Sequence, residues 1–224
     1  MGFRNVVFGY HGCDARLASQ LLHVKQKIRI SRGEFEWLGH GMYFWENNLE
    51  RAREWAKEKS RQGLIDTPAV IGAVLDLKNC CDFSDKYYLD LYQTYCMQMQ
   101  RRYQSKNMRM PVNFAPAGSI PKDRVCRKLD CAIIEWMHER MQYLNSRQAG
   151  IADTSELPPF DSVRGLFTEG HPVFEGSGIY RNTHIQICIR NPECILGYFL
   201  PREGEMDEIE GFEVEESPAL IRWN

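Results

Sequence analysis

Three short stretches of this 224-residue chain combine residue types suited to binding a flat ring and a sugar hydroxyl group. They are residues 10–12 (Tyr-His-Gly), 39–44 (Gly-His-Gly-Met-Tyr-Phe) and 183–187 (Thr-His-Ile-Gln-Ile). A glycine directly after a strand exposes N–H and C=O groups that can pair with a carboxamide. His11 can hydrogen-bond a hydroxyl group, and Tyr43 offers a flat face for stacking. Glycines 39 and 41 allow the backbone to approach a ligand closely.

In this order the stretches resemble the NAD-binding motifs of the ADP-ribosyltransferase superfamily, in the branch of diphtheria toxin and the poly-ADP-ribose polymerases. That branch has a His, then a Tyr in a Gly-x-Gly-x-Tyr-Phe turn, then a Glu on a late strand. The resemblance implies an NAD-dependent mono-ADP-ribosyltransferase, most like the bacterial toxins of toxin–antitoxin and phage-defence systems, with an antitoxin as a further partner. It assigns His11 to the ribose, Gly12 to the nicotinamide carboxamide and Tyr43 to ring stacking. The remaining motif residues expected to contact NAD are Tyr10, Gly41 and Phe44.

The third motif departs from the family pattern, because Gln186 stands where the catalytic Glu is expected. A glutamine can hydrogen-bond a ribose hydroxyl, but it cannot carry negative charge beside an oxocarbenium ion or accept a proton. Three explanations follow. The acceptor needs no base, or the site binds NAD or ADP-ribose without turnover, or another carboxylate acts, with Glu175 first and Asp161 or Glu169 behind it. We favour a working enzyme, because His11 and Tyr43 are both present.

Two arginines are candidates for the NAD pyrophosphate, since a planar guanidinium suits phosphate oxygens. Arg16 follows the first motif, and Arg164 precedes the third. Each could equally be an ordinary surface residue.

Charge is unevenly distributed along the chain, although the net charge is only −2. Residues 97–128 carry eight basic side chains and one acidic side chain, with Tyr103 and Phe114 among them. Cations for phosphates and rings on which bases stack are what a single-stranded nucleic-acid surface requires. We therefore expect the acceptor to be a nucleobase in RNA or DNA, bound through Arg101, Arg102, Tyr103 and Arg109. The alternative is a solvated face, and the acidic segment 201–224 is either a solvated end or a nucleic-acid mimic or antitoxin-docking segment.

Other functions remain open at this point. Transfer to a protein side chain uses the same chemistry, and NAD glycohydrolysis uses water as the acceptor. A non-catalytic NAD or ADP-ribose binding module is compatible with Gln186. Nucleotide binding through a Rossmann or P-loop mechanism is not expected, because no GxGxxG follows a strand and no GxxxxGK is present.

The elements that must position these residues indicate an α+β fold, taken as one domain over residues 1–224. Strands are expected at 5–10, 42–45 and 69–77 and within 173–199, where alternation at 184–189 puts three isoleucines on one face. Helices are expected at 15–24 and 47–60, with Asp14 and Asn47 or Asn48 as caps. Helical spacing at 87–104 and 129–148 indicates a helical insertion between residues 85 and 150, which the family resemblance does not cover.

Composition indicates a cytoplasmic protein with a real core, 43% hydrophobic and 12% aromatic. No signal-peptide pattern opens the chain, and the longest apolar run, 69–77, is too short to cross a bilayer, so no membrane partner is expected. The eight cysteines form no CxxC pair and no zinc-finger spacing with histidine. We therefore expect reduced, mostly buried thiols and no metal.

Overall fold

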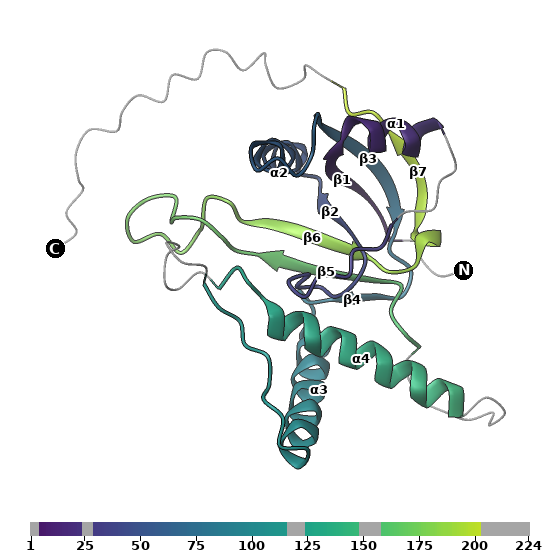
Figure 1. The fold of residues 1–224 in the computed structure, drawn as a ribbon, viewed down its shortest axis with the longest axis vertical. Helices are drawn as coiled ribbons and strands as arrows, with labels where there is room; N and C mark the ends of the chain where they lie inside the picture. Colours follow the sequence, from purple (N-terminus) through teal and green to yellow (C-terminus); the bar gives the residue numbers. More distant parts are fainter. Residues whose placement is uncertain (1–4, 24–28, 116–123, 148–157, 203–224) are drawn as a thin grey trace.

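The computed structural model describes residues 5–23, 29–115, 124–147 and 158–202 (Figure 1). Most of the acidic segment, residues 203–224, lies outside the described residues. In chain order the elements are β1 (Val6–Asp14), α1 (Ala15–His23), β2 (Met42–Glu46), α2 (Leu49–Arg61), β3 (Pro68–Asp76), β4 (Cys80–Asp82), α3 (Lys86–Ser105), α4 (Lys128–Arg147), β5 (Ser162–Phe167), β6 (His184–Ile189) and β7 (Ile195–Phe199). A short 3-10 helix, Pro192–Cys194, joins the last two strands.

The strands form a seven-stranded sheet in the order β4-β5-β6-β2-β1-β3-β7. Neighbouring strands run antiparallel, except that β4 and β5 are parallel. The joint between β1 and β2 is short, since only Gly9–Glu46 and Tyr10–Trp45 pair there, whereas β1 pairs with β3 along its full length. The two strands therefore separate after Tyr10, and the sheet divides into the groups β4-β5-β6-β2 and β1-β3-β7. This mixed architecture confirms the expected α+β class.

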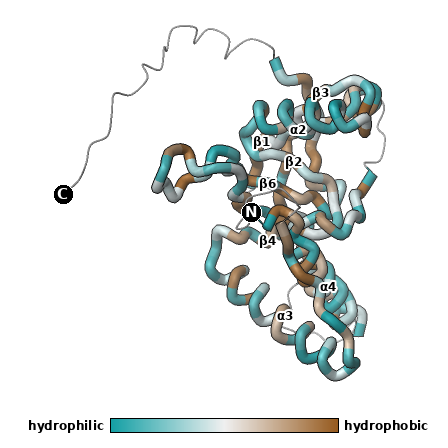
Figure 2. Tube along the Cα trace, turned by 60° about the vertical axis from the view of Figure 1, so that its left-hand side comes forward, coloured by the Kyte–Doolittle hydropathy of each residue, from teal (hydrophilic) through white to brown (hydrophobic). Residues whose placement is uncertain are grey.

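The helices cover the sheet in two groups, as Figure 1 shows. Helices α1 and α2 lie against β1 and β3. Helices α3 and α4 pack on each other and on the β4-β5-β6 part of the sheet, through a core that includes Met99, Ile133, Met137 and Val163. Figure 2 shows hydrophobic residues concentrated in the strands and along α4, with hydrophilic residues over much of α3. The helical insertion is thus packed into the fold on one side of the sheet.

Local sequence explains most of these elements. Asn48 caps α2 by accepting a hydrogen bond from the Arg51 amide, and Asp85 caps α3 in the same way through the Tyr87 amide. In β6, Ile187 and Ile189 enter one core while Cys188 enters the other, so the strand is buried on both faces. The expected strand at 5–10 extends four residues further, to Asp14. Residues 173–183, expected to be β, contain no named strand, and β4 and β5 were not expected.

Two further features concern the cysteines and the possibility of a membrane-spanning helix. All eight cysteines are free thiols, and five of them are buried. Among the described residues, no helix has both the length and the apolar character needed to span a bilayer.

Candidate active site

A cavity of about 560 Å³ lies where β1 and β2 separate, and residues from all three motifs line it. His11 comes from β1, Tyr43 from β2 and Gln186 from β6, so the fold brings together three side chains that are distant in sequence. The volume is typical of a small-molecule site. Besides Tyr43, five Phe and Trp residues line the cavity: Phe35, Trp37, Trp45, Trp55 and Phe167.

His11 bridges the two separating strands with its side chain. Its Nδ1 lies 2.8 Å from the carbonyl oxygen of Tyr43. A carbonyl can only accept, so Nδ1 carries the hydrogen and Nε2 of the neutral ring is an acceptor. Burial lowers the pKa of His11, although the bond to Tyr43 opposes that effect. The cavity is therefore lined by a neutral imidazole that can accept a hydrogen bond from a ligand hydroxyl group.

Tyr43 is fixed at its hydroxyl end by the preceding turn. The hydroxyl donates to the Gly39 carbonyl over 2.8 Å and accepts from the Leu38 amide over 2.9 Å. Burial raises the pKa of Tyr43 well above its ordinary value, and the negative potential of Cys188 adds to this. With its hydroxyl occupied and uncharged, Tyr43 can offer only its ring to a ligand.

Gln186 is oriented by a bond that fixes which of its amide atoms is available. The indole Nε1 of Trp37 lies 2.5 Å from Gln186 Oε1. An indole N–H can only donate, so the amide oxygen must face Trp37. The remaining NH₂ group makes Gln186 a hydrogen-bond donor toward the cavity.

Two carboxylates line the cavity. Glu169 forms an ion pair with Arg51 of α2, and both side chains are largely buried. Glu36, in the segment before β2, accepts a hydrogen bond from the Ser31 hydroxyl. Burial raises the pKa of Glu36, and the Ser31 bond only partly offsets that increase. Of the carboxylates proposed from sequence to replace the missing Glu, Glu169 is therefore the one at the cavity.

Three cavity residues carry buried polar atoms without a hydrogen-bond partner in the described structure: Trp45 Nε1, Arg51 Nε and His184 Nε2. His184 Nδ1 lies 2.6 Å from the Asn182 carbonyl, so its unpaired Nε2 is an acceptor, whereas the other two atoms are donors. Burial lowers the pKa of His184, which favours the neutral ring. Buried polar atoms are nearly always satisfied in folded proteins, so this group indicates a site built for a ligand with both donors and acceptors.

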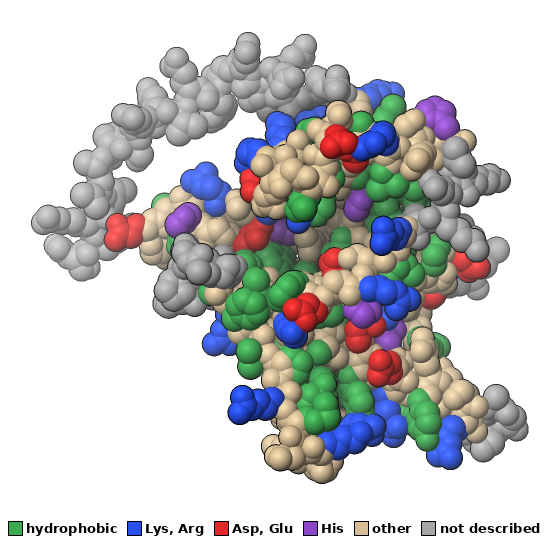
Figure 3. Space-filling model, in the orientation of Figure 1, with side chains coloured by type: hydrophobic (Ala, Val, Ile, Leu, Met, Phe, Trp, Pro, Cys, Tyr) green, Lys and Arg blue, Asp and Glu red, His purple; other side chains and the backbone are tan. Residues whose placement is uncertain are grey.

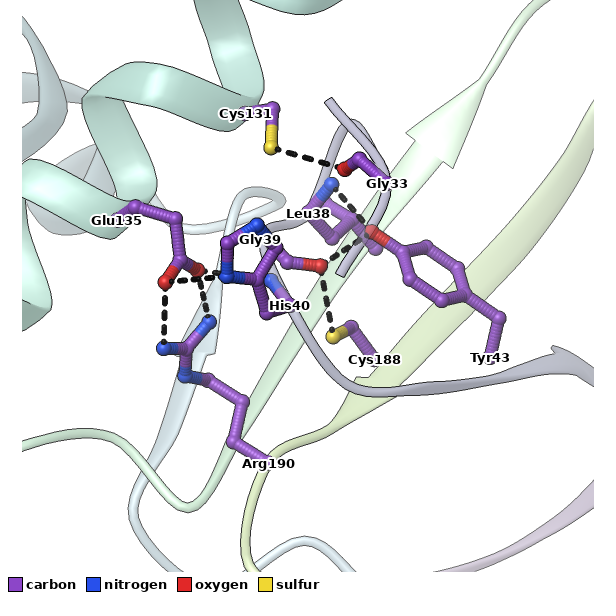
Figure 4. Close-up of polar contacts among 9 residues, drawn as sticks. All are labelled: Gly33, Leu38, Gly39, His40, Tyr43, Cys131, Glu135, Cys188 and Arg190. Carbon is purple, nitrogen blue, oxygen red and sulfur yellow. Dashed lines mark hydrogen bonds and ion pairs between the residues drawn. The ribbon is translucent and has the colours of Figure 1, made fainter. Parts of the chain in front are cut away.

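The turn that carries the second motif is held from behind by α4 (Figure 4). Glu135 accepts a hydrogen bond from the His40 amide over 2.7 Å, contacts His40 Nδ1 at 3.0 Å and pairs with Arg190. Gly39 has a φ of +83°, and a Cβ there would lie 2.6 Å from Glu135 Oε1. Only glycine fits both constraints. Gly39 thus allows close approach to α4, and the helical insertion positions Tyr43.

Arg127, next to α4, packs against the aromatic residues of the cavity wall. The Arg127 guanidinium stacks on two aromatic residues that line the cavity, 4.7 Å from the Trp37 ring and 4.1 Å from the Phe167 ring. Phe114, also in the insertion, contacts Phe35 edge-on at 6.0 Å. The insertion therefore supports the cavity through Arg127 and Phe114.

Gly41 lines the cavity as expected, but three other motif residues do not. Tyr10 packs its ring edge-on against Phe199, with centroids 6.1 Å apart. Phe44 is fully buried in the core. Gly12 lies beneath α2, where a Cβ would come within 2.4 Å of the Ala52 carbonyl oxygen, so its small size serves helix packing. The geometry does not support a side-chain contact with a ligand for Tyr10 or Phe44, and it gives Gly12 a packing role.

Neither arginine expected at the pyrophosphate lines the cavity. Arg16 is largely exposed and pairs with Asp14 and Asp66. Arg164 pairs with Glu46 and Asp82, which raises its pKa chiefly through the Glu46 bonds. Within β5 it lies opposite Ile187, whereas its neighbour Gly165 lies opposite Gln186, so Arg164 is on the other face of the sheet from Gln186. Arg29 lines the cavity instead, and no described residue forms an ion pair with it.

Two of the carboxylates proposed from sequence to replace the missing Glu also lie outside this cavity. Glu175 is exposed on the β5–β6 connection and lines neither of the two cavities described here. Asp161 accepts hydrogen bonds from the Asn79 amide and the Asn191 side chain, and it lines a second cavity of about 500 Å³ beside α4. These positions correct the expectation that either acts beside Gln186.

The residues expected to bind nucleic acid lie at the end of α3 and just beyond it, and none lines the cavity. Arg101, Arg102 and Arg109 are exposed, and the Arg102 guanidinium lies 5.2 Å from the Trp136 ring. Tyr103 is partly buried against the α3–α4 core, so its ring is not a free stacking surface. The arginines remain accessible to phosphates, but the expected role of Tyr103 is not supported.

Several cavity residues were not singled out from sequence: Arg29, Glu36, Trp37, Arg51, Trp55 and His184. Trp55 lies on the helix that follows the Tyr43 motif, and that position is the sequence signal that could have identified it. His184 alternates with Gln186 on β6, which places both on one face. Glu36 and Trp37 lie in an irregular segment with no periodicity to guide a prediction. Among the described residues no cluster of three or more His, Cys, Asp or Glu side chains could hold a metal ion.

No family model matches the chain, and no solved structure matches it. An uncharacterized protein of Methanocaldococcus jannaschii is 38% identical over 65 residues. The match covers 29% of this chain and 30% of that protein, so the similarity extends over less than a third of either. The chemistry of the site must therefore be argued from its own geometry.

Proposed function

We propose that this chain is a mono-ADP-ribosyltransferase that cleaves NAD and transfers ADP-ribose to a macromolecule, with a nucleobase in RNA or DNA as the preferred acceptor. The observation that carries the proposal is the single cavity shared by His11, Tyr43 and Gln186. The short β1–β2 joint supports it, because it divides the sheet into two groups beside that cavity, as a split-sheet NAD cleft requires.

The cavity residues fit NAD by type. The nicotinamide ring stacks on Tyr43, with Trp55 as a second aromatic surface. The unpaired donors on Trp45 and Arg51 and the unpaired acceptor on His184 suit a carboxamide, which offers one acceptor and two N–H groups. His11 accepts a bond from a ribose hydroxyl through Nε2.

The remaining NAD contacts follow from which groups are available. The Gln186 NH₂ group donates to a ribose hydroxyl oxygen. Arg29, at the cavity, takes the pyrophosphate role that neither Arg16 nor Arg164 can fill.

In the reaction the bond between C1′ of the ribose and the nicotinamide nitrogen breaks, and its electron pair leaves with nicotinamide. The acceptor nitrogen or oxygen then forms a bond to C1′ and loses a proton. Fixing the ring on Tyr43 and the sugar on His11 and Gln186 orients the breaking bond. Aromatic walls exclude water from the oxocarbenium-like ribose, which favours transfer over hydrolysis.

The direct test incubates the purified protein with NAD labelled in its adenylate group, together with RNA, DNA or cell lysate. We expect nicotinamide release, and label that survives protease but is lost with nuclease. Label lost with protease indicates a protein acceptor, and free ADP-ribose alone indicates a glycohydrolase. Saturable NAD binding without nicotinamide release would show a binding module and overturn the proposed transferase.

The choice of nucleic acid as acceptor rests on the exposed arginines at the end of α3. Figure 3 shows Lys and Arg side chains around the lower end of the molecule, where α3 ends. The triple variant Arg101→Ala/Arg102→Ala/Arg109→Ala is expected to bind single-stranded RNA at least tenfold more weakly. The slope of log affinity against log salt should become shallower by about 2, because about 0.7 is lost per phosphate contact. Fluorescence anisotropy of a labelled oligonucleotide across salt concentrations measures both quantities.

The matched control removes three cations from α2, through Arg53→Ala/Lys57→Ala/Arg61→Ala. Two of these form ion pairs within their own helix, so a smaller change in RNA affinity is expected. Equal losses in the two triple variants, or none in either, would argue against a nucleic-acid surface at α3.

Gln186→Glu is expected to raise the rate of nicotinamide release about tenfold, because it places a negative charge beside the developing positive charge on the ribose. The carboxylate can still accept the Trp37 indole bond, so the side chain keeps its position. The measurement is initial nicotinamide release at saturating NAD, with the exposed Gln93→Glu on α3 as control. A rate unchanged or lower than that of the native protein would show that charge at this position does not limit the reaction.

A further inference from the structure

Transfer to a hydroxyl or amine requires a group that accepts the proton of the acceptor, and Gln186 cannot do so. Two carboxylates line the cavity. Glu169 is paired with the Arg51 guanidinium, so its carboxylate is already engaged by a cation. Glu36 has a hydroxyl partner, Ser31, and forms no ion pair with a described residue. Of the two, Glu36 is therefore the better proton acceptor.

The backbone holds Glu36 in a defined place. Its amide donates to the Gly33 carbonyl over 3.3 Å, and its own carbonyl accepts from the Gly39 amide over 2.7 Å. The next residue, Trp37, donates to Gln186. The Glu36 carboxylate therefore belongs to the same short segment that orients Gln186 and supports Tyr43.

We propose that Glu36 is the general base of this site and takes over the proton-accepting role that Gln186 cannot perform. The inference rests on the proposed transferase function and adds a catalytic residue to it. As the C1′–nicotinamide bond breaks, the acceptor oxygen or nitrogen bonds to C1′, and its proton moves to the Glu36 carboxylate. The products are nicotinamide and the ADP-ribosylated acceptor, and Glu36 later returns the proton to water. The Ser31 hydroxyl keeps the carboxylate aimed during this step.

The groups around Glu36 determine how the site responds to pH. They are His40 in the same segment, Lys59 of α2, Tyr43 of β2, Cys131 of α4 and Cys188 of β6. Burial raises the pKa of Glu36, while the Ser31 bond and the potentials of His40 and Lys59 act in the opposite direction. A base must be ionised to act, so transfer should decline as the pH falls through this raised pKa.

The test compares Glu36→Gln with Glu34→Gln, a change two residues away at a carboxylate that pairs with Lys128 at the surface. Transfer to RNA should fall by about 100-fold in Glu36→Gln, a loss expected for a general base, and remain within twofold in Glu34→Gln. The acidic limb of the pH–rate profile should be absent in Glu36→Gln. The affinity for NAD, followed by quenching of the cavity tryptophans, should change less than threefold.

Thermal stability provides a readout independent of activity. A carboxyl group with a raised pKa in the fold is destabilising when ionised, so stability is lost as the pH rises through that pKa. Glu36→Gln removes this ionisation, and the variant should therefore have a higher Tm than the native protein at pH 8, with a smaller difference at pH 5. Glu34→Gln should show no such pH-dependent gain.

The outcomes separate this inference from the proposed function. Suppose that the native protein transfers ADP-ribose and that Glu36→Gln retains the native rate and the acidic limb of the pH–rate profile. The proposed transferase function is then supported, and the assignment of Glu36 as general base is wrong. Loss of the acidic limb in Glu169→Gln rather than in Glu36→Gln would overturn the assignment equally. Absence of nicotinamide release from the native protein would overturn both proposals.

Discussion

Replacing His11 by alanine is expected to slow nicotinamide release about 100-fold, the loss typical of removing one group that stabilises a developing charge or orients the reacting centre. His11 is the side chain that joins the separating strands at the cavity, and its Nε2 is the acceptor left available for a ribose hydroxyl. Alanine removes that acceptor and leaves the Tyr43 carbonyl without its partner. Single-turnover release of nicotinamide at saturating NAD measures the chemical step apart from binding.

The matched control is His23→Ala. His23 is at the exposed end of α1, where its Nδ1 also bonds a carbonyl, that of Ser19, over 2.9 Å. A rate within twofold of the native protein is expected, because His23 does not line the cavity. Circular dichroism and Tm establish that both variants are folded. A folded His11→Ala protein that keeps its full rate would remove His11 from the proposed mechanism.

The parts of the site predicted correctly from sequence are those tied to regular strands. Alternation in β6 predicts that Gln186 lies on the face opposite the isoleucines, and the Gly39–Gly41 turn predicts that Tyr43 lies near the start of the strand that follows it. The resemblance of the three motifs to the ADP-ribosyltransferase pattern implies that His11, Tyr43 and Gln186 lie together, and all three line one cavity. Such predictions succeed because the period of a strand fixes the direction of each side chain.

The arginines show why the other parts of the site could not be predicted from sequence. Arg164 is on β5, a strand of six residues whose buried face includes Gly165 and whose more exposed face includes Leu166, so its sequence lacks the apolar–polar alternation that identifies a half-exposed strand. Its partners, Glu46 and Asp82, lie 118 and 82 residues away in sequence. Whether an arginine faces a ligand or a carboxylate depends on such distant neighbours, and no local pattern records them.

The carboxylates illustrate the same limit in a connecting segment. Glu169 and Glu175 both lie between β5 and β6, and only the path of that segment places Glu169 at the cavity and Glu175 in solvent. Glu36 lies in an irregular segment whose shape is set by the Gly33 and Gly39 contacts and by Ser31. Periodicity carries no information there, although the residue types are visible in the sequence.

Both helices of the insertion were expected from their spacing, but their relation to the site was not. Glu135 on α4 contacts His40, 95 residues earlier, and Arg190, 55 residues later. These contacts make the insertion a support for the turn that carries Tyr43 (Figure 4). A change on α4 should therefore affect both stability and ligand binding.

Glu135→Ala is expected to reduce the free energy of unfolding by about 3 kcal/mol, because it leaves Arg190, whose side chain is only 15% exposed, without its counter-charge. For a chain of this size the corresponding decrease in Tm is about 6–10 °C. It also removes the acceptor of the His40 amide. Displacement of the turn that fixes Tyr43 should then weaken NAD binding about tenfold. Differential scanning calorimetry and quenching of tryptophan fluorescence by NAD measure the two effects.

The pH dependence of the destabilisation identifies its electrostatic origin. Burial alone would raise the pKa of Glu135, but the Arg190 and His40 bonds outweigh it and lower the pKa below the usual 4.5. A lowered pKa contributes stability that is present above the unfolded-state value and lost as the pH falls through the folded-state value. The difference in the free energy of unfolding between the native protein and Glu135→Ala should therefore decrease below pH 4.5. Glu139→Ala, one helical turn away and exposed, should stay within about 0.5 kcal/mol of the native protein at every pH. Equal effects from the two alanine variants would mean that α4 contributes general helix packing and does not position the Tyr43 turn.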